Sequence, residues 1–204
     1  MANIIRDEGV IKFNYQLKIG AKVEQSDYLA LEKWRTIFFR MNLIGEYTDL
    51  QLGFGNLSKR CEGNSFIISG SQTGRHSQLK REQYCKVIES NLQKSRVIAL
   101  GTIAPSSESL THYAIYQTNP QINYVFHVHH NKFWEKMLNT NYDRTPKDIR
   151  YGTIEMAQAT AKIINLKSSG IFAMAGHEDG IISYGNTAAE AGKMILNAFK
   201  IISN

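Results

Sequence analysis

Three histidines fall within four positions in the segment "VFHVHH", at His127, His129 and His130. In a β-strand, side chains two positions apart point to the same face, so His127 and His129 would project together. Two imidazoles on one face of a strand can supply half of a divalent metal site, although such a pair also occurs as an ordinary structural feature. His130 would point to the opposite face, and we expect it to lie outside the ligand set.

Two further residues could complete a metal site. His177 lies in "AGHEDG", where a tight turn between glycines leaves little core for an imidazole to fill. Glu108 follows two serines in "PSSESL" and would lie in the first turn of a helix. A carboxylate at that position also interacts favourably with the helix dipole, and Ser106 or Ser107 could simply cap the helix. Taken alone, the segment leaves both roles open.

The periodicity of apolar residues predicts alternating helices and strands that would position these side chains. Helices are expected at 26–43, 79–95, 106–119 and 152–167, and strands at 64–70, 96–103, 123–130, 170–176 and 180–185. The last helix opens with Thr187 and Glu190 in a capping box. The strands "GIFAMAG" and "GIISYG" are separated only by the turn "HED", so they would form an antiparallel hairpin. We therefore predict a single α/β domain over residues 1–204, an α/β/α sandwich with a mixed, largely antiparallel central sheet, to which the leader 1–25 adds a strand.

Length and composition place the chain among ordinary globular proteins. It has 204 residues, of which 43% are hydrophobic and 21% charged, enough for one compact domain. The N-terminus lacks the apolar core of a signal peptide, and no run approaches the ~20 apolar residues of a membrane-spanning helix. Cys61 and Cys85 match neither a CxxC motif nor a disulfide framework. We therefore expect a cytoplasmic protein with reduced thiols and no contact with a membrane.

The net charge is +6, and the excess is concentrated in one window. Residues 59–96 contain eight basic and three acidic residues, with Phe66 and Tyr84 as the aromatic ones. So few aromatic residues give little support to a surface on which nucleic-acid bases stack. A solvated basic helix face is the favoured interpretation, binding of a phosphorylated small molecule comes second, and nucleic acid is not expected as a partner.

Five segments follow one another along the chain: "FGNLSKR" at 54–60, "SGSQTG" at 69–74, "PSSE" at 105–108, "HVH" at 127–129 and "GHEDGII" at 176–182. Together they resemble the class II aldolase/adducin family, which includes fuculose-1-phosphate aldolase, ribulose-5-phosphate 4-epimerase and methylthioribulose-1-phosphate dehydratase. The resemblance extends over roughly residues 26–200 and implies the fold of that family. The two acids after His177 depart from the family pattern, where small or apolar residues are commoner.

The resemblance implies a metal centre and a phosphate site. The ligands of a divalent metal would be His127, His129, His177 and Glu108. Zinc is the usual metal, and manganese, iron and cobalt are compatible with the same ligands. Glu108 would also move off the metal to act as the catalytic acid/base. The phosphate of the substrate would be held by Gly55, Asn56, Ser58, Thr73, Gly74, Ser106 and Ser107. Family members usually form tetramers, so a homotetramer is expected.

Three neutral imidazoles leave a bound metal with its full charge and an open position, which is typical of a catalytic site. Together with this site, the resemblance implies a lyase that cleaves a small phosphorylated ketose by a retro-aldol reaction, through a metal-stabilised enediolate. An epimerase or a dehydratase on the same scaffold stays open, although family epimerases tend to have aspartate at position 108. A non-enzymatic, adducin-like interaction module is the third interpretation, but that branch lacks the metal histidines. The spacing of Tyr142 and Tyr151 does not assign either of them as a proton donor.

Overall fold

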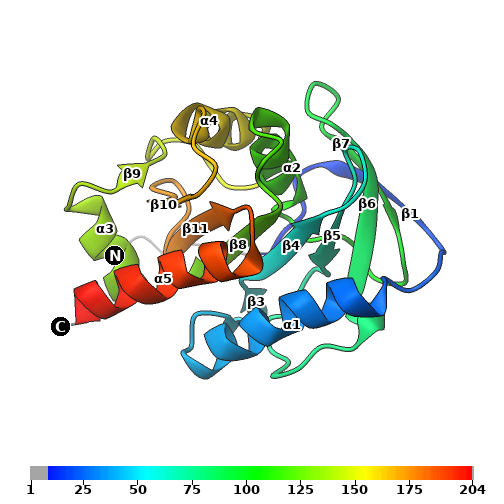
Figure 1. Cartoon of the computed structure of the whole chain (residues 1–204), viewed down its shortest axis with the longest axis horizontal. Helices are drawn as coiled ribbons and strands as arrows, with labels where there is room; N and C mark the ends of the chain where they lie inside the picture. Colours follow the sequence, from blue (N-terminus) through cyan, green and yellow to red (C-terminus); the bar gives the residue numbers. More distant parts are fainter. Residues whose placement is uncertain (1–8, 204) are drawn as a thin grey trace.

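The computed structural model describes residues 9–203 and contains a nine-stranded sheet (Figure 1). Its strands are β1 Asn14–Lys18, β4 Asn56–Arg60, β5 Phe66–Ser69, β6 Tyr84–Asn91, β7 Arg96–Leu100, β8 Tyr124–His129, β9 Asp143–Arg144, β10 Gly170–Ala173 and β11 Gly180–Gly185. Across the sheet they follow the order β1-β7-β6-β5-β4-β8-β11-β10-β9. Neighbours are antiparallel except for the edge pairs β1–β7 and β10–β9, which are parallel. The mixed, largely antiparallel sheet predicted from the sequence is therefore confirmed.

Helices cover both faces of this sheet and complete an α/β/α sandwich (Figure 1). They are α1 Gln25–Arg40, α2 Ser109–Thr118, α3 Asn131–Leu138, α4 Ile154–Ile164 and α5 Ala188–Ser203. The core beneath α2 and α4 includes Val125 and Met156, whereas the core beneath α1 and α5 includes Phe126 and Ile195. Successive residues of β8 thus enter opposite cores, as strand geometry requires. Among residues 9–203, no helix combines the length and the apolar character needed to cross a membrane.

A small two-stranded hairpin stands apart from the main sheet. It consists of β2 Gly45–Tyr47 and β3 Leu52–Phe54, which pair in antiparallel fashion between α1 and β4. The chain at Gly74 lies so close to this hairpin that an added Cβ would stand 2.2 Å from the carbonyl oxygen of Gly45. No element was predicted here from the sequence.

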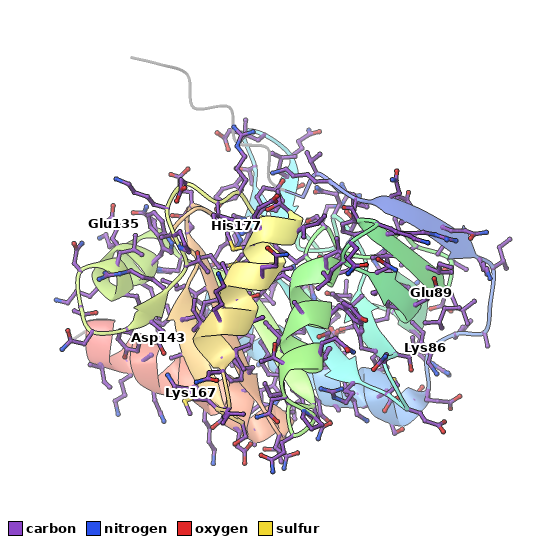
Figure 2. All side chains as sticks on the ribbon, turned by 90° about the horizontal axis from the view of Figure 1, so that it is seen from above. Lys86, Glu89, Glu135, Asp143, Lys167 and His177 are labelled. Atoms are coloured by element: carbon purple, nitrogen blue, oxygen red, sulfur yellow. The ribbon has the colours of Figure 1, made fainter. Side chains whose placement is uncertain are left out.

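The helix predicted at 79–95 is wrong. The chain forms a short 3-10 turn at 81–83 and then β6, which lies inside the sheet between β5 and β7. Cys85 and Val87 are fully buried there, and a β-bulge separates Val87 from Glu89. The bulge interrupts the strict alternation by which a strand is recognised, and the remaining spacing of apolar residues resembles that of a helix. The expected basic helix face is therefore absent, and Lys86 and Glu89 project from a strand (Figure 2).

Other local expectations have mixed outcomes. Residues 56–60 of the motif at 54–60, to which no strand was assigned from the sequence, form β4 because β5 and β8 pair with them on both sides. The N-cap of α2 is Glu108 rather than a serine. The capping box of α5 is confirmed, since the Glu190 N–H donates to Thr187 Oγ1 at 3.1 Å and Thr187 N–H donates to the Glu190 carboxylate at 3.2 Å. The antiparallel hairpin of β10 and β11 is also confirmed, and the leader contributes β1 at the sheet edge. Residues 1–8 of that leader lie outside the described part of the chain.

Candidate metal centre

β8 and the turn between β10 and β11 bring three histidines together. Val125 faces the core beneath α2, and the alternation of β8 places His127 and His129 on that same face. β11 pairs Gly180 with His129, so the turn just before β11 holds His177 beside the end of β8. One ring nitrogen from each histidine lies within 4.8 Å of the others. The three residues, 0%, 2% and 3% exposed, form a buried nitrogen cluster.

Hydrogen bonds at Nδ1 decide which ring nitrogen faces the shared space. His127 Nδ1 lies 3.2 Å from the carbonyl oxygen of Ile181, which can only accept, so Nδ1 carries the proton and Nε2 the lone pair. His129 Nδ1 lies 3.1 Å from the Tyr47 hydroxyl. The Nε2 atoms of His127 and His129 face each other at 2.8 Å. Burial lowers the pKa of His127 well below its usual range, and the nearby His177 lowers it further, so this imidazole is neutral.

A carboxylate and a tyrosine border the cluster. Glu108, at the start of α2, is fully buried, and its Oε1 lies 3.3 Å from His177 Nδ1. The ring of Tyr151 stacks on the imidazole of His177, with centroids 4.4 Å apart and planes inclined by 23°. His177 itself lies beside one end of α4, the helix that follows Tyr151 (Figure 2). Tyr142 instead packs against the core on the opposite side of the sheet. Of the two tyrosines considered from the sequence, only Tyr151 is at the site.

These side chains fit a divalent metal. His127 presents a lone pair to a second ring nitrogen 2.8 Å away, and two nitrogens so close need a proton or a cation between them. Three converging imidazole nitrogens beside a carboxylate form a donor set that zinc and similar metals prefer. His127, His129 and His177 would hold the metal, and Glu108 lies within reach of it. The four residues predicted as ligands are therefore gathered in one place.

A small polar pocket adjoins the histidines. Asn56 pairs with His127 across β4 and β8, and Ser107 directly precedes Glu108, so the pocket and the cluster are contiguous. Six of the seven residues predicted for phosphate binding line it: Gly55, Asn56, Thr73, Gly74, Ser106 and Ser107. Ser71 and Gln72 also line it and were not singled out, although both lie inside the motif "SGSQTG". An isolated bridge between Gly70 and Pro105 joins the two segments that form most of the pocket.

Ser58 is not among the residues that line this pocket. Its hydroxyl is fully buried and lies 2.6 Å from His112 Nδ1 and 2.6 Å from the Tyr116 hydroxyl. Both partners project from α2 onto β4. Burial lowers the pKa of His112 to about 3, so its imidazole is neutral. The structure therefore places the Ser58 hydroxyl in an internal hydrogen-bond network between the sheet and α2.

A buried arginine that was not predicted from the sequence contacts the loop lining the pocket. Arg35 of α1 is 1% exposed, and its Nη2 donates to three carbonyl oxygens of the loop 73–76, at 3.0, 3.3 and 2.6 Å. Arg35 lies at helical spacing between the buried residues Leu31 and Phe38. A charged residue on the apolar face of a helix is the signal that could have identified it.

Comparisons with known proteins agree with this fold. The family profile described as "Class II Aldolase and Adducin N-terminal domain" matches residues 41–200. A search of curated protein sequences finds no match. Among solved structures, YgbL from Escherichia coli, described as a candidate aldolase, epimerase or decarboxylase, has a TM-score of 0.68 at 20% identity, covering 89% of each chain.

Two aldolase structures are similar to the same extent. L-fuculose-1-phosphate aldolase from Thermus thermophilus has a TM-score of 0.66 at 18% identity, covering 88% of this chain and 92% of the other. The sugar-phosphate aldolase from Thermotoga maritima has a TM-score of 0.69 at 13% identity, covering 88% and 93%. These likenesses concern the fold, and the family profile spans most of the sequence. The chain belongs to the class II aldolase and adducin family.

Proposed function

We propose that the protein is a metal-dependent lyase that cleaves a small phosphorylated ketose by a retro-aldol reaction. The observation that carries this proposal is the position of three buried histidines and Glu108 directly beside a polar pocket. The shared fold with a fuculose-phosphate aldolase and a sugar-phosphate aldolase supports a substrate of the same class. Loss of the metal histidines would favour the adducin-like interpretation, but all three are present here.

The pocket provides groups suited to a phosphate. Ser106 and Ser107 lie just before α2, whose N-terminus carries a partial positive charge that favours an anion. The Ser106 hydroxyl accepts a hydrogen bond from the Glu108 N–H at 3.3 Å and keeps its own proton to donate. The Thr73 hydroxyl donates to the Gly70 carbonyl at 2.8 Å, so Thr73 would contribute chiefly by shaping the loop. The serines are therefore the main candidates for side-chain contacts with the phosphate.

Glu108 is the candidate for proton transfer. A divalent metal held by the three histidines would polarise the ketose carbonyl and stabilise negative charge that develops beside it. Glu108 stands beside His177 and is fully buried, so it could move a proton to or from the adjacent carbon with bulk water excluded. Tyr151 covers His177, and its hydroxyl accepts a hydrogen bond from the Val10 N–H at 3.1 Å.

Three further properties are part of the proposal. We propose zinc as the metal, because three nitrogens and a carboxylate suit it, with manganese, iron and cobalt as alternatives. A homotetramer should give a light-scattering mass about four times the 23.1 kDa of one chain, and the mass of a single chain would refute it. The unpaired thiols of Cys61 and Cys85 support a cytoplasmic location, which cell fractionation would test.

Metal content is the first test of the proposed function. Protein purified without a histidine tag should contain about one divalent metal per chain by elemental mass spectrometry, since one cluster offers one ligand set. The His129→Ala variant should lose that metal. The His130→Ala variant is the matched control, because His130 caps α3 and accepts from the Phe133 N–H at 3.2 Å, outside the cluster. A wild-type protein that stays metal-free after reconstitution would refute the proposal of a metal-dependent lyase and favour an interaction module.

The second test addresses the reaction. Wild-type protein should cleave a member of a panel of phosphorylated ketoses, detected by the aldehyde product. The Glu108→Gln variant should retain the histidine-bound metal but turn over about 10²–10⁴-fold more slowly, which is the usual contribution of a general acid/base. A comparable rate in the variant would mean that another residue moves the proton. Epimerised or dehydrated products in place of cleavage would assign the site to those reactions.

A further inference from the structure

His129 is held by a short chain of hydrogen bonds that leads away from the metal site. Its Nδ1 lies 3.1 Å from the Tyr47 hydroxyl, and that hydroxyl donates to Asp179 Oδ2 at 3.0 Å. The other oxygen of Asp179 accepts from the Asn131 side-chain amide at 3.0 Å. We infer that Tyr47 and Asp179 are positioning residues for the metal, because together they hold His129 with Nε2 directed at the shared ligand space. The inference rests on the proposed metal site.

The hydrogen bonds from Asp179 through Tyr47 to His129, called the relay below, determine the tautomer of His129. A tyrosine hydroxyl has one proton, and a carboxylate oxygen can only accept, so the Tyr47 proton points to Asp179. The Tyr47 oxygen must then accept from His129, which places the ring proton on Nδ1. Nε2 of His129 is left with its lone pair, and it faces His127 Nε2 at 2.8 Å. His127 and His129 thus present their lone pairs to the same point.

The hairpin that carries Tyr47 also fixes the plane of the ring. Phe54 of β3 stacks on the His129 imidazole, with centroids 5.4 Å apart and planes inclined by 28°. Tyr47 of β2 packs against Phe54 at 4.7 Å. The ring is therefore held at one face by Phe54 and at one edge by Tyr47. The same hairpin is tied to the phosphate pocket, because the Gly53 N–H donates to Gln72 Oε1 at 2.7 Å.

Asp179 is placed for this role by the turn that also carries His177. It is 3% exposed and has a left-handed backbone conformation, with φ of 66°. Its backbone carbonyl accepts from the His130 N–H at 3.0 Å, which joins the turn to the end of β8. A buried carboxylate linked through a hydroxyl to a ligand imidazole increases electron density at the metal-binding nitrogen and orients the ring. This role would account for Asp179, the second of the two acids after His177 that depart from the family pattern.

Metal affinity tests the relay. Zinc dissociation constants would be measured by competition with a chromogenic chelator for wild type, Tyr47→Phe and Asp179→Asn. Asparagine is chosen because it tolerates a left-handed backbone. Removing an outer partner of a metal ligand typically weakens affinity about 10–100-fold, and we expect that range for Tyr47→Phe. The double variant should bind zinc no more weakly than Tyr47→Phe alone, because the effects of two substitutions in one hydrogen-bond network do not add. Tyr124→Phe, at the opposite end of β8, should leave affinity unchanged.

A second readout separates this inference from the proposed function. ¹H–¹⁵N spectra of zinc-bound protein labelled at histidine should show the His129 Nδ1 proton protected from solvent exchange in wild type and exchanging faster in Tyr47→Phe. Unchanged affinity together with unchanged exchange in that variant would overturn the relay. If wild type binds no metal at all, the proposed function fails, and the same exchange measurement on metal-free protein still decides whether Tyr47 and Asp179 hold the His129 ring.

Discussion

Replacement of His112 by asparagine should change how the stability of the protein depends on pH. His112 is completely buried between α2 and β4, and burial lowers its pKa from an ordinary value of 6.5 to about 3. Its Nδ1 lies 2.6 Å from Ser58 Oγ, and Nε2 has no hydrogen-bond partner among residues 9–203. Protonation inside the fold would therefore place an uncompensated charge in the core. Asparagine carries an acceptor near the position of Nδ1, so it can keep the Ser58 contact without titrating.

The sign of the effect follows from the two pKa values. The unfolded chain takes up a proton at this histidine below pH 6.5, whereas the folded chain resists it until about pH 3. Stability is therefore fully present above the unfolded pKa and is lost as pH falls toward the folded pKa. The slope is about 1.4 kcal/mol per pH unit for one group, so His112 alone should cost on the order of 2 kcal/mol between pH 7 and pH 5.

Urea unfolding at fixed protein concentration between pH 5 and pH 8 would measure this loss. Wild type should lose more stability on acidification than His112→Asn, and the two curves should converge as the pH falls. The variant is expected to be less stable at pH 8, because it leaves space beside Tyr116. His76→Asn, at a partly exposed position outside the network, should keep the wild-type slope. Parallel curves for wild type and His112→Asn would refute the assignment of His112 as a neutral, buried histidine.

Two further changes test the loop that lines the pocket. Gly74→Ala should lower the free energy of unfolding in urea by about 3 kcal/mol or more, because the added Cβ would meet backbone oxygen atoms that cannot move aside. Gly63→Ala is the control: an added Cβ has nothing within 4 Å, so it should cost only about 1 kcal/mol for the left-handed backbone. Equal losses in the two variants would contradict this reasoning. Arg35→Lys should destabilise by about 1.5–3 kcal/mol, since the shorter lysine side chain would not bring its ammonium to the position of Nη2, and a wild-type midpoint would show that these hydrogen bonds contribute little.

The histidine cluster could be predicted largely because its pattern is local. The alternation of a strand fixes the common face of His127 and His129 from sequence alone, and the glycines around His177 indicate its turn. The pairing that brings the turn to the strand is not local, and here the order of five motifs supplied the missing information. The prediction of the fold succeeded for the same reason. The helix wrongly predicted at 79–95 shows the limit, since β5 and β7 decide that this segment is a strand.

Side-chain networks between distant segments could not be predicted. Tyr47 and His129 are 82 residues apart, and no feature of the segment "GEYTDLQLGF" indicates that its tyrosine reaches a metal ligand. Ser58 illustrates the opposite case. It belongs to a motif whose neighbours line the pocket, but partners 54 and 58 residues away hold its hydroxyl inside the protein. A motif thus identifies the segment, whereas packing decides which of its side chains reach the site.

The two strand histidines differ in what holds their Nδ1 atom, and this difference matters for the proposed metal site. His127 donates to the backbone carbonyl of Ile181, a group that no substitution removes while β8 and β11 stay paired. His129 depends on two side chains, the Tyr47 hydroxyl and the Asp179 carboxylate. Backbone pairing within the sheet therefore orients the His127 ring, whereas two side chains that can be substituted orient the His129 ring. At the proposed metal site, substitution at position 47 or 179 should therefore change metal affinity while the three histidines and the sheet that carries them remain the same.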